Sequence, residues 1–109
     1  MSAKRVVPRE QARRDAEEAI DHYLQEAGDR VALRFIDALE ESFRRIGLSP
    51  AAGSPRYAHE LGLPGLRFRR LTRFPYLVFY LEQGDHIDVW RVLHAKRDIP
   101  AWLQDVDAD

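Results

Sequence analysis

The stretch that decides the fold is "FPYLVFYLEQGDHIDVWRVLHAKRD", residues Phe74 to Asp98. Two apolar runs, Tyr76–Glu82 and Ile87–Leu93, flank the turn sequence Gln83-Gly84-Asp85, a pattern typical of a β-hairpin. Nearly every residue of the first run is apolar, so we expect that strand in the middle of a sheet with both faces covered. The second run ends among charged residues. The hairpin therefore predicts the centre of a sheet with a polar cluster at one end.

Two amphipathic helices are predicted upstream of the hairpin. Small and apolar residues recur at helical spacing from Ala12 to Leu24, and Gly28 is a suitable helix end. A second stripe runs from Ala32 to Ile46, with Asp29 as its expected N-cap. The joint between the two helices is short enough to make them a helical hairpin.

Shorter elements complete the predicted domain. Arg5–Val7, closed by a proline, predicts an edge strand, and Leu66–Leu71 adds a third strand to the meander. Residues 48–64 are rich in Pro, Gly, Ser and Ala, which predicts a loop with at most one helical turn. Ile99–Leu103 predicts a final helical turn. The expected fold class is α+β, ordered β-α-α-β-β-β, with helices packed on a small, mostly antiparallel sheet.

Composition limits the classes of protein that the chain can form. Its 109 residues, 45% of them apolar, predict one domain, residues 1–109, with a frayed acidic end at Asp105–Asp109. No apolar run approaches the roughly 20 residues of a membrane span, and no signal-peptide segment is evident, so we expect a cytoplasmic protein with no membrane contact. The absence of cysteine excludes a disulfide scaffold and thiolate metal sites. Because 17 basic residues balance 18 acidic ones, we expect no sequence-specific binding of nucleic acid.

Three arginines on one predicted strand are candidate binding residues. Alternation along the strand sends Arg67 and Arg69 to one face of the sheet and Arg70 to the other. At least one of them must therefore meet the helices, the sheet edge or a partner, and a carboxylate of a partner is the natural complement.

A second candidate group lies where the last strand leaves the sheet. Arg91, His94 and Arg97 are predicted to gather there, with Asp98 paired to one of the arginines. The group either contacts a partner or target, or fastens the C-terminus. The other histidines lie on separate elements with no second ligand at a recognisable interval, so no metal site and no cofactor are predicted. Trp90 and Phe79 are expected in the core.

The chain resembles the RelE/ParE toxins of bacterial type II toxin–antitoxin modules, and its closest match is to the ParE branch. The resemblance covers almost the whole chain and is carried by the Ala12–Leu24 helix with Asp15, "LSPAAGSP" (48–55), "GLPGLRFRRL" (62–71), "RFPYLVFY" (73–80) and "VWRVLHAKRD" (89–98). It implies a toxin held inactive by a cognate ParD-like antitoxin, whose C-terminal segment lies along the sheet and helices. ParE-like members are associated with inhibition of DNA gyrase.

RelE-like members of the same superfamily instead cut mRNA on the ribosome. Where they commonly carry an arginine this chain has Leu77, and where a tyrosine is expected near the C-terminus it has Trp102 and Leu103. None of the three transfers protons, and His94 is the only evident base. The sequence therefore favours an inhibitor that acts by binding. A ribosome-dependent endonuclease and a non-toxic member that only binds its antitoxin are the alternatives.

Overall fold

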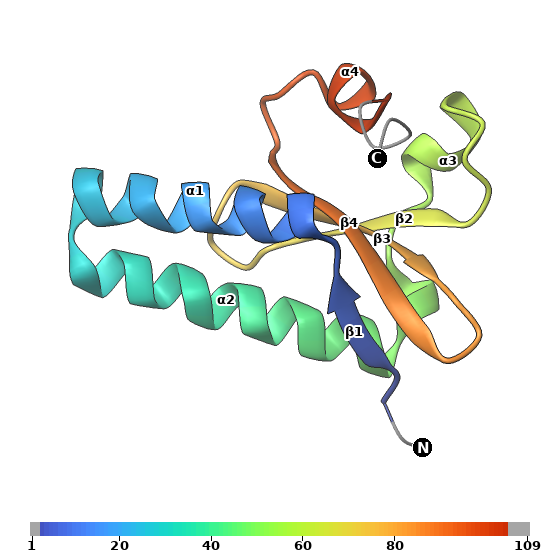
Figure 1. Cartoon of the computed structure of the whole chain (residues 1–109), viewed down its shortest axis with the longest axis horizontal. Helices are drawn as coiled ribbons and strands as arrows, with labels where there is room; N and C mark the ends of the chain where they lie inside the picture. The colour runs from blue at the N-terminus through green and yellow to red at the C-terminus, as the bar shows by residue number, and fades with distance from the viewer. Residues whose placement is uncertain (1–2, 105–109) are drawn as a thin grey trace.

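A computed structural model describes residues 3–104, which form a four-stranded sheet with a long helical hairpin on one face (Figure 1). The elements in chain order are β1 (Arg5–Pro8), α1 (Glu10–Ala27), α2 (Asp29–Leu48), the 3-10 turn η1 (Pro50–Ala52), α3 (Arg56–Glu60), β2 (Leu66–Arg70), β3 (Tyr76–Glu82), β4 (His86–His94) and α4 (Ile99–Gln104). The predicted α+β class and the order of its main elements are confirmed. The predicted fraying of residues 105–109 lies outside the described residues.

The strand order explains the two long helices between β1 and the meander. The sheet runs β1-β4-β3-β2, with β2, β3 and β4 antiparallel and β1 parallel to β4. A parallel pair needs a long crossover connection, and here the helical hairpin supplies it. Strand β1 is an edge strand and β3 is internal, as the sequence predicted. A bulge between Phe79 and Tyr80 shifts the β3–β4 register by one residue.

Local details differ from the sequence predictions at two places. The segment predicted as a loop contains both η1 and α3, and Ser54 between them forms a bridge with Phe68 on the outer edge of β2. The predicted N-cap at Asp29 is wrong. Gly28 precedes α2 at a φ of 90°, and Asp29 is the first helical residue, where its carboxylate faces the positive end of the helix dipole.

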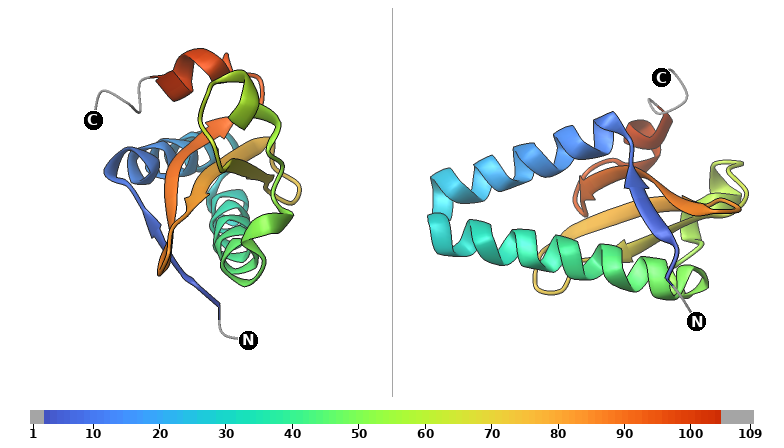
Figure 2. Two further views of the ribbon diagram at one scale, coloured as in Figure 1. Left: turned by 90° about the vertical axis from the view of Figure 1, so that its right-hand side faces the viewer. Right: turned by 60° about the horizontal axis from the view of Figure 1, so that its bottom comes forward.

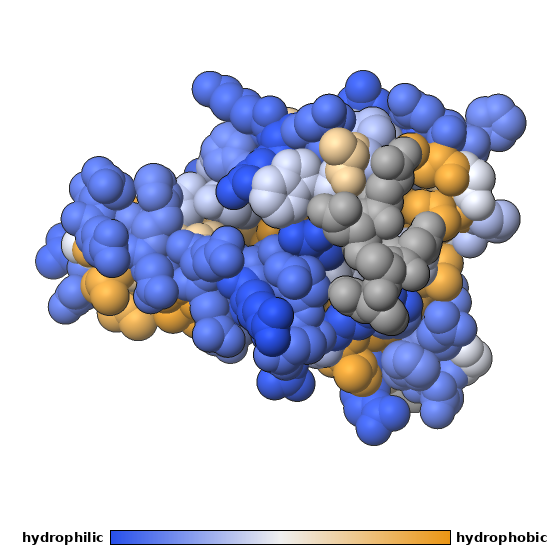
Figure 3. All heavy atoms as spheres, turned by 45° about the horizontal axis from the view of Figure 1, so that its top comes forward, coloured by the Kyte–Doolittle hydropathy of each residue, from blue (hydrophilic) through white to orange (hydrophobic). Residues whose placement is uncertain are grey.

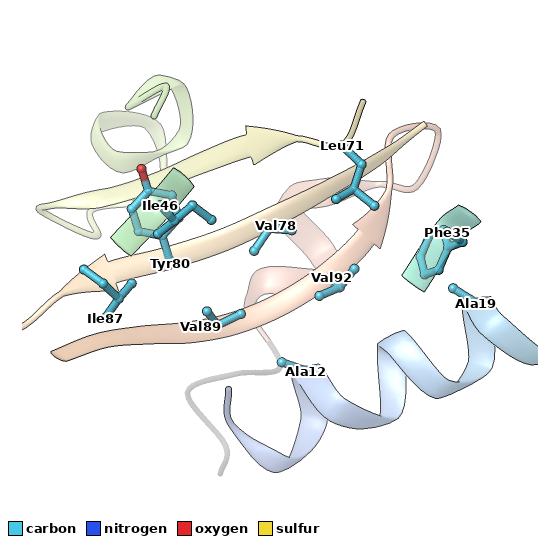
Figure 4. Packing of buried hydrophobic residues seen from close by; sticks show 10 residues of the cluster. All are labelled: Ala12, Ala19, Phe35, Ile46, Leu71, Val78, Tyr80, Ile87, Val89 and Val92. Carbon is cyan, nitrogen blue, oxygen red and sulfur yellow. The ribbon is translucent and has the colours of Figure 1, made fainter. Parts of the chain in front are cut away.

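Hydrophobic clusters fill both faces of the sheet. The cluster under the helical hairpin is drawn in Figure 4 and contains Ala12, Ala19, Phe35, Ile46, Leu71, Val78, Tyr80, Ile87, Val89 and Val92. The opposite face is closed by α3, α4 and Leu66, Leu77, Phe79, Trp90, Leu93, Ile99 and Leu103. Trp90 and Phe79 are therefore core residues, as predicted. Close packing also fixes Gly47, where a Cβ would lie 2.7 Å from the Lys4 carbonyl oxygen.

The far end of the helical hairpin projects beyond the sheet (Figures 1 and 2). Leu24 and Leu33 lie toward this end, and Leu33 is 60% exposed. Hydrophilic residues otherwise cover most of the face seen in Figure 3. Among the described residues, no helix is both long and apolar enough to cross a membrane.

Candidate functional site

A buried ion pair joins α1 to β4. Asp15 accepts hydrogen bonds from Arg91 Nε at 2.8 Å and from Arg91 Nη2 at 2.9 Å. Strand β1 pairs with β4 only as far as Val89. Beyond that point the backbone N–H of Val92 donates a hydrogen bond to the carboxylate of Asp15 at 3.0 Å. The side chains of Arg91 and Asp15 are only 3% and 5% exposed. The guanidinium also donates from Nη1 to the Trp102 carbonyl oxygen at 3.1 Å, so α1 and the C-terminal segment together shield it from a partner.

A cavity of about 490 Å³ lies next to this ion pair. Helix α1, the start of β3, the end of β4 and the C-terminal segment all contribute to its wall. The lining residues are Asp15, Glu18, Ala19, His22, Tyr76, Val92, Leu93, His94, Arg97 and Trp102. The structure therefore brings His94 and Arg97 together at one cavity, beside the buried Arg91.

The imidazole of His94 is held in a defined tautomer. Its Nδ1 accepts a hydrogen bond from the backbone N–H of Lys96 at 3.1 Å, and its ring packs edge-on against Tyr76 with centroids 5.1 Å apart. Burial lowers the pKa of His94, and the nearby positive charges, Lys96 and Arg97 foremost, lower it further. The ring is therefore neutral at pH 7 with its proton on Nε2, which makes this nitrogen a hydrogen-bond donor.

Two further side chains give the cavity donor character. Burial raises the pKa of Tyr76, so its phenol keeps its proton at neutral pH. The guanidinium of Arg97 lies 4.2 Å from the ring centroid of Trp102 and is exposed to solvent on its other side. The predicted pairing of Asp98 with an arginine is wrong. Within residues 3–104, Asp98 forms no salt bridge and instead accepts from the Ala101 N–H at 3.4 Å, near the start of α4.

The arginines of β2 lie at a separate place. Their register confirms the predicted alternation, because Arg67 and Arg69 pair with Tyr80 and Val78 of the helix-covered face, whereas Arg70 pairs with Leu77 of the other face. Arg67 donates a hydrogen bond to the carbonyl oxygen of Gly53 at 2.7 Å and so stabilises the loop between η1 and α3. Arg70 is exposed.

Arg69 lines a small hollow of about 210 Å³ at the end of α2, together with Arg44, Arg45, Leu48, Ser49 and Ala52. Arg44 and Arg45 both bind Glu41, and these contacts, the Arg44 hydrogen bond foremost, lower the pKa of Glu41 to about 2. Arg69 forms no salt bridge within the described part of the chain. It is therefore the cation of this hollow that is available to an acidic partner.

Sequence reasoning missed Asp15 as the partner of Arg91, and it missed Glu18, His22 and Tyr76 as polar lining residues of the cavity. One signal was present. Asp15 falls on the small-residue stripe of α1, between Ala12 and Ala19, where a carboxylate is buried and needs a cationic partner. In the part of the chain that the structure describes, no group of three or more His, Cys, Asp or Glu side chains could hold a metal ion.

Comparison with known proteins identifies the family of the chain and agrees with its fold. The family described as "ParE toxin of type II toxin-antitoxin system, parDE" matches residues 6–99. The chain belongs to the ParE toxin family. A solved structure titled "Chromosomal ParDE TA system from P. aeruginosa" has a similar fold, with a TM-score of 0.71 at 22% sequence identity over 86% of this chain and 98% of that chain. No curated protein matches the sequence. The predicted membership of the ParE branch is confirmed.

Proposed function

We propose that this ParE-family toxin acts in the cytoplasm by binding DNA gyrase, and that a ParD-like antitoxin neutralises it. One observation carries the choice of binding over RNA cleavage. RelE-like toxins cut mRNA with basic residues on the sheet, but here the positions where an arginine and a C-terminal tyrosine were expected hold apolar residues that pack beneath α4. Leu77 is 7% exposed and Leu103 is 1% exposed, and both belong to the cluster beneath α4.

The state of His94 supports the same choice. Cleavage of RNA at a 2′-hydroxyl needs a base that can accept its proton. Nδ1 of His94 accepts a hydrogen bond from the Lys96 N–H, so the single proton of the neutral ring is on Nε2. Neither nitrogen is then available to accept a proton from a 2′-hydroxyl. The residue is therefore suited to donate a hydrogen bond to a bound group rather than to remove a proton from it.

Expression of the toxin without antitoxin distinguishes the candidate targets. We expect growth arrest, a block of DNA supercoiling by purified gyrase and a DNA-damage response, because a bound inhibitor would stop the topoisomerase. Mapping of mRNA 5′ ends should show no codon-linked cuts within minutes of induction.

Two results would contradict this proposal. Codon-linked cuts with active gyrase would identify a RelE-like endonuclease, and normal growth with a correctly folded protein would identify a member that only binds its antitoxin. Coexpression of the cognate antitoxin is the matched control, and it should restore both growth and supercoiling.

The antitoxin is proposed to contact the β2 side of the molecule. Strand β2 is the last strand of the sheet, and although Ser54 already pairs with Phe68 on its outer edge, Arg69 presents a cation beside it that an acidic segment of a partner can bind. Because Arg67 already holds the Gly53 carbonyl, Arg69 is the cleaner residue to change. Arg69→Glu should weaken the purified toxin–antitoxin complex by about 2 kcal/mol or more if Arg69 pairs with a desolvated carboxylate.

Arg56→Glu supplies the matched control for this measurement. It makes the same change of charge at an exposed position of α3, and we expect no measurable effect on the affinity. Equal affinities for the Arg69→Glu variant and the unaltered toxin, measured by calorimetry, would place the antitoxin elsewhere.

A further inference from the structure

The cavity between α1 and the end of β4 offers hydrogen-bond donors and few acceptors. Arg97, Tyr76 and His94 line it, and His22 of α1 adds a second imidazole. These groups come from α1, from β3, from β4 and from the turn that follows β4. The cavity can therefore surround one ligand group with donors from several directions.

One of the two carboxylates of the cavity wall is already neutralised. Both oxygens of Asp15 are occupied, since Arg91 binds each of them, Gln11 donates to one at 3.3 Å and Val92 donates to the other. Glu18 is the other carboxylate in the wall; it is exposed and, within residues 3–104, has no ion-pair partner. Glu18 is thus the one wall carboxylate that opposes an anionic ligand, against the donors of Arg97, Tyr76 and the two imidazoles.

The surrounding charges favour the same kind of ligand. Lys96 and Arg70, which do not line the cavity, act electrostatically on His94 together with Arg97 and His22. The guanidinium of Arg97 is restrained by its stacking on Trp102, so it is held in place before a ligand arrives. Several basic groups therefore act on this end of β4, although the formal net charge of the chain is only −1.

We propose that this cavity binds the phosphate group of a small ligand of about mononucleotide size. A phosphate has three terminal oxygens that accept hydrogen bonds from different sides, which matches donors arriving from separate elements. The volume of about 490 Å³ is within the usual range of small-molecule sites. A carboxylate is the rival ligand, but its two oxygens lie in one plane and would use fewer of these donors. The proposal is independent of gyrase and of the antitoxin.

The four histidines of the chain provide an internal test in the unaltered protein. Inorganic phosphate and a nucleoside monophosphate are titrated in turn while the imidazole signals are followed by NMR. The signals of His22 and His94 should shift and saturate, whereas those of His59 on α3 and His86 at the start of β4 should not. The nucleoside without its phosphate should leave all four unchanged.

A matched pair of variants separates the cavity from general attraction by charge. Arg97→Gln should weaken binding of the nucleoside monophosphate about 10- to 100-fold, because a hydrogen bond to a charged group is lost. Lys96→Gln removes the same charge one residue away but outside the cavity wall, and it should weaken binding by about twofold or less. Glu18→Gln should tighten binding, because it removes the anion at the wall.

Several outcomes would overturn the assignment. These are no saturable shift at His22 and His94, equal shifts at all four histidines, equal weakening by Arg97→Gln and Lys96→Gln, or tighter binding of glutarate than of phosphate. Tighter binding of glutarate would show that the cavity binds a carboxylate, such as an acidic side chain of a protein partner. Because the Arg97 side chain is exposed, its variant is expected to fold, and an unchanged melting temperature checks this.

Discussion

Replacement of Asp15 by alanine is expected to lower the free energy of unfolding by about 3–5 kcal/mol. The change leaves the Arg91 guanidinium buried without its carboxylate, and it also removes the acceptor of the Val92 N–H. Uncompensated buried charge costs far more than the loss of an exposed pair. Urea denaturation followed by circular dichroism measures the effect, which is a large share of the 5–15 kcal/mol typical of a whole domain.

A double variant distinguishes loss of the ion pair from loss of packing. In Asp15→Leu with Arg91→Met both charges are removed, so the penalty for an unpaired ion disappears and part of the lost stability should return. The recovery should be incomplete, because the Val92 N–H still lacks its acceptor. A loss below about 1 kcal/mol for Asp15→Ala would show that the pair behaves as a solvated one.

The sequence predicted the fold well because its strongest signals are periodic and local. The apolar run of β3, the turn at Gln83-Gly84-Asp85 and the stripes of α1 and α2 each indicate their own structure. The segment with η1 and α3 was harder, because short helices rest on tertiary contacts, such as the packing of Tyr57 against Phe68 and Phe79, more than on intrinsic propensity.

The candidate site was only partly predictable for a related physical reason. The group Arg91, His94 and Arg97 is adjacent along the chain, so its clustering followed from sequence. The environment of Arg91 depends on Asp15, which lies 76 residues away in the sequence. Asp15 reaches Arg91 because β1 ends before the last residues of β4 and leaves that edge of β4 open to α1. Without that partner, Arg91 looked like a binding residue, although the structure buries it.

Replacement of Trp90 by alanine is the second change expected to have a large effect, roughly 3–5 kcal/mol of unfolding free energy. Trp90 is 8% exposed and belongs to the cluster beneath α4. Its Nε1–H donates to Asp88 at 3.0 Å, and Arg9, which also binds Asp88, lies over its ring at 4.7 Å. The indole therefore links the second core to the start of α1, and its loss should leave a cavity and loosen the Arg9 contact.

Trp90→Phe is the control that separates packing from the polar contacts of the indole. The phenyl ring fills much of the same volume but cannot donate to Asp88, so we expect a smaller loss, about 1–2 kcal/mol. For a domain near 100 residues each kcal/mol shifts the melting temperature by about 4–8 °C, so calorimetry separates the two variants. If Trp90→Ala and Trp90→Phe were equally destabilising, the hydrogen bond to Asp88 would be the main contribution of Trp90. If both were near neutral, α4 would not depend on the cluster beneath it, and the closure of this sheet face, on which the choice of binding over RNA cleavage rests, would lose its support.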